Sequence, residues 1–197
     1  MPILLGKSLI CLALICLSVT PAWSGELKLL LDKQRSHISF KARSQVTEAS
    51  GRFVDYAGRL LRPSSGWANS RFDLKMNVSQ VEFGAVPLEK LFLMQSLIKA
   101  IPDPLFSFVS EQVTLTSPLK LQISGIIRNG SHQHRVNVSA QILETTSLLT
   151  HLRGDLSGHG ASEVGLMGEP NMPSMNYSGR IYFDLVFRQM RDPGSFQ

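Results

Sequence analysis

The feature of this sequence that most constrains its fold is a strict alternation of apolar and polar residues in several separate segments. In residues 71–78 every even position is apolar and every odd position is polar or charged. Side chains alternate between the two faces of a β-strand, so this pattern predicts a strand with one dry face. The pattern recurs in residues 135–142 and 180–188, and more briefly in residues 38–42, 106–108 and 119–123. Several such strands between Gly-, Pro- and Asn-containing turns indicate a mainly β domain, either an antiparallel sandwich or a barrel.

Three segments depart from the alternation. From Pro87 to Ile101 apolar residues recur at helical spacing after a proline that suits a first turn, which predicts one short helix that lids a barrel end or completes a core. After Val78 the apolar positions change from even to odd, and a bulge near Ser79-Gln80 would explain the slip. Residues 153–178 are rich in Gly, Pro, Met and Asn and are expected to form a long excursion, with a weak strand candidate at 160–166.

The first twenty-four residues have the composition of a cleavable signal peptide. A single positive charge at Lys7 precedes an apolar run from Leu9 to Val19, which is about half the ~20 residues that a membrane-spanning helix needs. The small residues Ala22 and Ser24 suit cleavage after Ser24. We therefore expect residues 1–24 to be a signal peptide, residues 25–197 to form a single domain, and the mature protein to be periplasmic or secreted.

Composition narrows the class of protein further. Both cysteines lie in the expected signal peptide, so the mature domain would hold together through its core without disulfides. The net charge of the whole chain is +5, and the basic residues are scattered rather than gathered in a stripe with aromatics, which argues against a nucleic-acid partner. A mild positive charge suits ordinary solubility, and also peripheral contact with an anionic envelope membrane.

Residue patterns for chemistry are sparse. His132 and His134 are two apart, but they sit beside Asn129-Gly130, where a turn is expected, and no third ligand stands at a recognisable metal-site spacing. The sequence has no nucleophile elbow or phosphate-binding glycine loop, and its carboxylates are spread singly. We expect no catalytic residues and no metal, and a metal-dependent enzyme using the two histidines ranks last among the functions considered.

The clearest indication of a function is the set of apolar residues on the predicted strands. A barrel of about eight strands either fills its interior with side chains or leaves room for one small ligand. Phenylalanines recur on the predicted inner faces, and large rings serve equally well as plugs or as smooth tunnel walls. Two interpretations stay open at this point: a ligand-holding tunnel, and a filled core whose surface acts as an interaction module of the cell envelope.

Five short motifs in order resemble the YceI-like family of periplasmic polyisoprenoid-binding proteins. Asp32, Ser36, Ile38 and Phe40 match a D-x-x-x-S-x-I-x-F opening strand. The others are a G-x-F-x-x-aromatic-x-G hairpin at 51–58, a long strand ending in Ser-Gln-Val at 73–81, a P-x-x-x-F-x-S strand at 104–110, and a Gly-to-Arg segment within 123–130. The pieces span nearly the whole mature chain, and the chain is identified as a divergent member of this family.

The resemblance implies a lipocalin-like antiparallel barrel whose apolar tunnel takes an isoprenoid chain, such as a quinone tail or a polyprenyl lipid, with no other cofactor. The corresponding function is a non-enzymatic lipid-binding protein that carries or sequesters such an amphiphile. The lining candidates are the inward-facing residues of the predicted strands and helix: Phe40, Phe53, Phe72, Leu74, Met76, Leu91, Phe92, Met94, Phe106, Phe108, Val138, Phe183 and Phe187.

Overall fold

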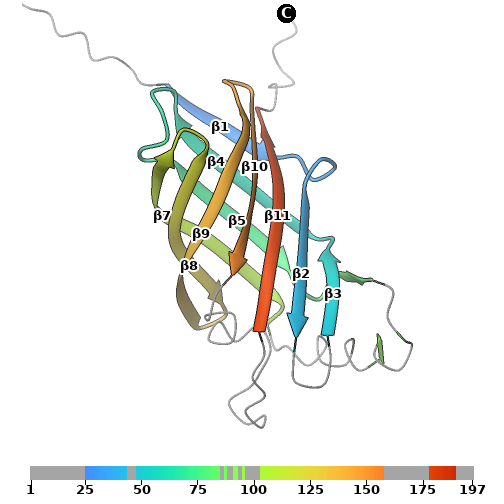
Figure 1. Cartoon of the computed structure of the whole chain (residues 1–197). Helices are drawn as coiled ribbons and strands as arrows, with labels where there is room; N and C mark the ends of the chain where they lie inside the picture. The colour runs from blue at the N-terminus through green and yellow to red at the C-terminus, as the bar shows by residue number, and fades with distance from the viewer. Residues whose placement is uncertain are drawn as a thin grey trace, which may run out of the picture.

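The computed structural model describes residues 25–43, 48–84, 87, 91–92, 95, 103–157 and 178–189 of the chain. Within them the chain is almost entirely antiparallel β-structure (Figure 1). The strands are β1 (Glu26–Leu31), β2 (His37–Arg43), β3 (Glu48–Phe53), β4 (Tyr56–Pro63), β5 (Arg71–Asn77), β6 (Val81–Phe83), β7 (Leu105–Ser117), β8 (Lys120–Asn129), β9 (His132–Thr145), β10 (Leu149–Ser157) and β11 (Ser178–Arg188).

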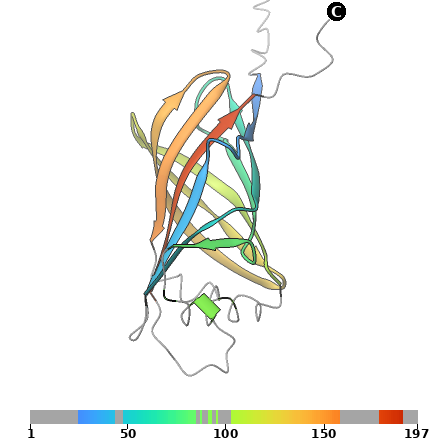
Figure 2. The same cartoon turned by 90° about the vertical axis from the view of Figure 1, so that its right-hand side faces the viewer.

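Eight of these strands close into a barrel. They pair in the order β1-β4-β5-β7-β8-β9-β10-β11, and β11 pairs with β1 to complete the ring. The strands β2, β3 and β6 continue the sheet from β11 toward one end of the barrel. Figure 2 shows the elongated barrel from the side, with its strands tilted to the long axis. The expected lipocalin-like antiparallel barrel is confirmed.

The three extra strands arise because the first three barrel strands are each broken near the middle. Leu31 of β1 lies opposite Phe187 of β11, and His37 of β2 lies opposite Asp184 of β11. The strands β1 and β2 therefore pair one after the other with the same strand, β11. In the same way β3 precedes β4 and faces β6, which follows β5. A break in each strand lets the end of the sheet that contains β2, β3 and β6 bend relative to the rest.

The break between β5 and β6 corrects one sequence expectation. The strand stops at Asn77, and a turn closed by the Gln80 amide donating to the Asn77 carbonyl at 3.2 Å separates the two strands. The Asn77 side chain accepts a hydrogen bond from the Ser79 amide at 3.1 Å, which stabilises the turn locally. The change of apolar phase therefore comes from a turn between two strands and not from a bulge within one continuous strand.

Asp32 and Ser36 fix the break between β1 and β2. The Asp32 carboxylate accepts the backbone amide of Gln34 at 3.1 Å and the Arg188 guanidinium at 3.0 Å. The hydrogen bond from Arg188 holds the pKa of Asp32 below its usual range, although burial opposes this. The Ser36 hydroxyl, almost fully buried, accepts the Val186 amide of β11 at 2.9 Å. Two residues of the opening motif thus position the chain for its second passage along β11.

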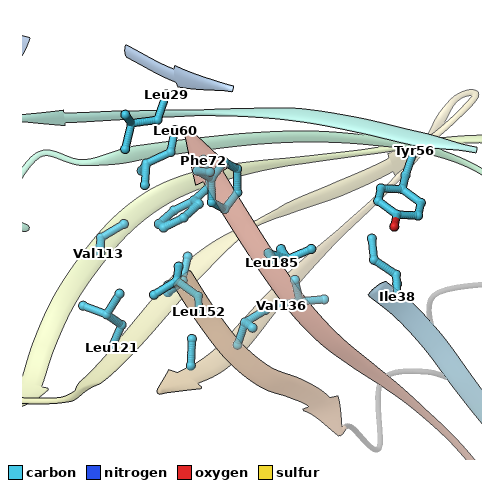
Figure 3. Close-up of a cluster of buried hydrophobic side chains, with 14 of the residues drawn as sticks. Leu29, Ile38, Tyr56, Leu60, Phe72, Val113, Leu121, Val136, Leu152 and Leu185 are labelled. Carbon is cyan, nitrogen blue, oxygen red and sulfur yellow. The ribbon is translucent and has the colours of Figure 1, made fainter. Parts of the chain in front are cut away.

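One end of the barrel is filled with side chains. Leu29, Leu60, Leu121, Leu152 and Phe187 have at most 1% of their surface exposed, and Figure 3 shows the labelled members of this group gathered away from Ile38 and Tyr56. The guanidinium of Arg62 lies 5.4 Å from the Trp67 ring centroid, and its Nη2 donates to the Thr146 carbonyl at 2.6 Å. We call this filled end of the barrel, with the buried leucines, Phe187 and Trp67, the closed end.

Two further expectations fall partly outside the described residues. Of the segment from Pro87 to Ile101, only residues 87, 91, 92 and 95 are described, and the Leu91 amide donates to the Pro87 carbonyl at 3.0 Å as in a helical turn. The expected excursion at 153–178 begins later than predicted, because β10 continues to Ser157, and the strand candidate at 160–166 lies outside the described residues. Among the described residues no helix is long and apolar enough to cross a membrane.

Candidate ligand-binding site

A cavity of about 120 Å³ occupies the barrel interior beyond the closed end and is partly open. Its wall is almost wholly apolar, because only Lys75 and Ser107 among its lining residues have polar side chains. The apolar lining residues are Ile38, Ala57, Phe72, Leu74, Met76, Phe106, Phe108, Ile123, Ile127, Val138, Leu152, Leu156, Ile181, Phe183 and Leu185. A dry pocket of this kind favours an apolar ligand over a polar one.

Strand register explains how these residues come together. Leu74 and Met76 on β5 lie directly opposite Phe108 and Phe106 on β7, so four apolar side chains share one inner face. Because side chains alternate along a strand, Lys75 between the two β5 residues is directed to the outer face and presents its backbone to the cavity. The interior near the cavity therefore contains no charged side chain from β5.

Two glycines on inner faces keep this half of the barrel from being filled. A Cβ at Gly154 would lie 2.6 Å from the ring of Phe183, and a Cβ at Gly125 would lie 2.6 Å from the ring of Phe108. Each ring therefore lies close to a glycine in the sheet, where a larger residue would clash with the ring and with a backbone carbonyl of the neighbouring strand. Sequence reasoning missed these glycines as site residues, although a glycine inside an alternating strand is itself a signal of close approach.

Seven of the thirteen residues predicted from the sequence line the cavity. They are Phe72, Leu74, Met76, Phe106, Phe108, Val138 and Phe183. The prediction omitted several aliphatic lining residues of the same strands, such as Ile127, Leu156 and Ile181, which share the alternating phase of the chosen aromatics. The alternation of apolar and polar residues predicts these aliphatic residues as well as the phenylalanines.

Three predicted residues are not among those that line the described cavity. The Phe40 and Phe53 ring centroids lie 5.2 Å apart, and Phe40 meets Phe83 edge-on at 6.3 Å, so these rings form their own cluster on β2, β3 and β6. Phe187 is fully buried at the closed end, and its ring centroid lies 5.9 Å from that of Phe72. Strand alternation gives the inner face correctly but does not distinguish the filled half from the hollow half.

The three predicted helix residues do not add to the described cavity wall. Leu91 is partly buried and Phe92 is 62% exposed, and neither is among the residues that line the cavity. Met94 lies outside the described residues. The contribution of the helix to ligand binding therefore stays a prediction.

His132 and His134 lie at the start of β9 rather than in the turn that the sequence suggested. Asn129 pairs with His132, which leaves only Gly130 and Ser131 as a two-residue hairpin loop. Gly130 has φ 53°, a conformation that glycine adopts without steric cost. In the described part of the chain no three His, Cys, Asp or Glu residues are grouped so that they could hold a metal ion.

A cluster of charged side chains lies outside the barrel. On the outer face of β10 and β11, the Asp184 carboxylate contacts the His151 ring and accepts hydrogen bonds from Arg153 Nε at 2.9 Å and Nη2 at 2.6 Å. Burial raises the pKa of Asp184, but the hydrogen bonds from His151 and Arg153 outweigh it and hold the pKa below its usual range. This cluster ties two strands together on the side away from the cavity.

Comparison with known proteins places this barrel among solved structures. No family model matches the sequence, and no curated protein matches it. A structure of Burkholderia cenocepacia BcnA matches with a TM-score of 0.63 and 17% identity, covering 79% of this chain and 98% of the other. A polyisoprenoid-binding domain from Saccharophagus degradans, implicated in plant cell wall breakdown, matches with a TM-score of 0.56 and 12% identity, covering 84% and 100%.

A third match is a mutant YceI protein of Campylobacter jejuni with a monobromobimane guest. It has a TM-score of 0.51 and 13% identity, and the match covers 76% of this chain and 90% of the other. The order of strands, the closed ring and these matches agree with the motifs found in the sequence. The chain therefore has the fold of the YceI-like β-barrels.

Proposed function

We propose that this protein is a non-enzymatic lipid-binding protein that carries or sequesters an isoprenoid chain, such as a quinone tail or a polyprenyl lipid, in its apolar cavity. The proposed location is the periplasm or the extracellular space, after cleavage near Ser24. The observation that carries the proposal is the cavity itself, whose lining holds fifteen apolar residues and only two with polar side chains. The Saccharophagus degradans domain of the same fold is a polyisoprenoid-binding domain, which supports the same class of ligand.

The physical chemistry of an isoprenoid fits such a wall. The chain is a string of methylated carbons, and each CH₂ moved from water into an apolar site gains about 0.8 kcal/mol. Affinity then accumulates along the chain with few polar contacts. The cavity volume of about 120 Å³ is close to the ~150 Å³ of an apolar cavity known to hold benzene. It therefore accommodates a short segment of the chain, and the rest of a long tail must leave through the open side.

The first experiment is native mass spectrometry of protein purified without detergent from the periplasm of its own source, followed by organic extraction of any adduct. The expected result is a stoichiometric hydrophobic adduct that the extract identifies as an isoprenoid lipid. An apo mass under conditions that preserve a control lipid-protein complex would favour the alternative, a barrel that acts only through its surface.

A matched pair of variants on one strand tests the site. Phe183→Glu places a carboxylate in the cavity wall, whereas Tyr182→Glu makes the same kind of change on the outer face of β11. The first variant should lose the adduct because an ionised group in an apolar wall must stay hydrated. The second should keep it. Equal retention by both folded variants, checked by circular dichroism, would show that this wall does not hold the ligand.

A further inference from the structure

An apolar and basic patch lies on the outer face of β5, β7 and β8, at the end of these strands whose inner residues line the cavity. Its members are Leu105, Lys75, Arg128, Val109 and Ile126, and we call it the rim patch. We propose that the rim patch docks the barrel on an anionic lipid bilayer, so that the mouth of the cavity meets the membrane. This inference rests on the proposed function, because it supplies the route by which a membrane lipid enters the cavity.

Strand register places the patch next to residues that line the cavity. Ser107 of β7 lies opposite Lys75 on one side and Arg128 on the other, so the two cations flank one strand about 10 Å apart. Leu105 is two residues further toward the β8–β9 hairpin on the same face, and it is 61% exposed. Its neighbour Phe106 lines the cavity from the inner face of the same strand, so the patch lies on the outer side of the cavity wall.

A second row of apolar residues lies behind the cations. Val109 of β7 is directly opposite Ile126 of β8, and both are partly exposed although they alternate with the inward residues Phe108 and Ile127. Outward positions of a water-facing barrel are normally polar. An apolar pair, two cations and a protruding leucine together form a surface with the amphipathic character that peripheral membrane proteins present to a bilayer.

The charge of the patch is suited to anionic lipid. Lys75 and Arg128 have no ion-pair partner among the described residues, whereas the neighbouring Arg135 is neutralised by Glu111 at 3.1 Å. Of the nearby carboxylates, Asp73 lies opposite Val109 and is paired with Arg59 at 2.8 Å, and Asp103 accepts the backbone amide of Leu105 at 3.0 Å. The local balance therefore remains positive, and each cation near an anionic membrane strengthens binding by a factor of about five.

The proposed ligand indicates that the partner of the rim patch is a lipid bilayer. An isoprenoid tail is insoluble and resides in the membrane, and its transfer through water would forfeit the same apolar burial that the cavity provides. A mouth held against the bilayer lets the tail move between two apolar phases without that cost. The apolar lining includes Met76, Phe106 and Ile127, whose strand neighbours Lys75, Leu105 and Arg128 belong to the rim patch, so the patch and the lining share the same end of these strands.

The opposite end of the barrel supplies matched controls. Leu148 is 63% exposed there, which nearly equals the exposure of Leu105 at the mouth. Lys28 and Lys120 are exposed cations of the closed end and have no ion-pair partner among the residues that the structure describes. Removing them changes the net charge of the protein as much as removing Lys75 and Arg128 does.

The experiment is sedimentation of the full-length mature protein with vesicles of neutral phosphatidylcholine, with and without phosphatidylglycerol. The unmodified protein should sediment with the anionic vesicles and much less with the neutral ones. The double variant Lys75→Gln/Arg128→Gln should weaken binding about 25-fold, from a factor of about five for each cation. Leu105→Ser should weaken it about tenfold, because a leucine side chain leaves the apolar phase. The controls Lys28→Gln/Lys120→Gln and Leu148→Ser should stay within twofold.

Three outcomes would overturn the proposal: no sedimentation with anionic vesicles, equal sedimentation with neutral vesicles, or a larger loss in the closed-end controls than in the rim variants. Native mass spectrometry of the same variants separates this failure from failure of the proposed function. If the rim variants retain the lipid adduct but all variants bind vesicles alike, only the docking surface is wrong. If no variant carries lipid although the rim variants lose vesicle binding, the carrier function is wrong.

Discussion

Truncation of two phenylalanines on β11 would distinguish the hollow half of the barrel from the filled half. Phe183 and Phe187 lie two pleats apart on the same inner face, yet Phe183 lines the cavity whereas Phe187 is fully buried against Phe72. Phe187→Ala would leave a closed void in tight packing, which costs about 3–5 kcal/mol of unfolding free energy. Phe183→Ala would only enlarge a cavity that already exists, so it should cost about 1–2 kcal/mol from partial loss of apolar burial.

The assay is urea unfolding at equilibrium, followed by circular dichroism and by tryptophan fluorescence. Trp67 is the only tryptophan in residues 25–197 and lies at the closed end, so fluorescence reports on the filled half while circular dichroism reports on the whole sheet. Coincident transitions with an unchanged slope against urea would permit direct comparison of the two free energies. If Phe187→Ala does not fold, the milder pair Phe187→Leu and Phe183→Leu should keep the same order with smaller differences.

Equal losses from the two truncations would refute the reasoning. That result would mean that Phe183 is packed as tightly as Phe187, and that the barrel is filled along its whole length. A loss at Phe183 that is smaller by about 2 kcal/mol would instead support a hollow half.

Three further perturbations test the supports of the fold. Asp184→Asn should remove the stabilisation that comes from the lowered pKa of this carboxyl group. That stabilisation is present above the unfolded pKa near 3.8 and is lost as the pH falls through the lower pKa of the folded state. The free energy of unfolding of the variant should therefore fall less steeply than that of the parent when the pH drops below about 4. Gly154→Ala should cost about 1–3 kcal/mol in urea unfolding and reduce the lipid adduct, because its Cβ would lie 2.2 Å from the Ser139 carbonyl oxygen and would displace a ring into the cavity. Ser36→Ala should cost about 1–3 kcal/mol by leaving the buried Val186 amide without its acceptor, and a variant as stable as the parent would show that the β1–β2 break does not need this hydrogen bond.

The fold class and the inner faces of the strands could be predicted from local patterns of residues. Alternation in residues 71–78, 135–142 and 180–188 is a local property of each strand, so it can be recognised without knowledge of the neighbours. The residues of the opening motif, Asp32 and Ser36, were recognised by resemblance, and the structure gives their physical role as hydrogen-bonding groups at a strand break. Seven of the thirteen predicted lining residues line the cavity because they share the inward phase of the barrel strands.

Which inward residues face a cavity and which fill the core depends on packing between strands that are distant in the sequence. Phe183 and Phe187 have the same phase on the same strand, but one packs on Gly154 and the other packs on Phe72, and both partners come from other strands. The turn after Asn77 was also beyond the reach of a periodicity argument, since a slip of phase does not distinguish a bulge from a break with a new pairing. Long-range register places these partners together, and no local pattern of residues records it.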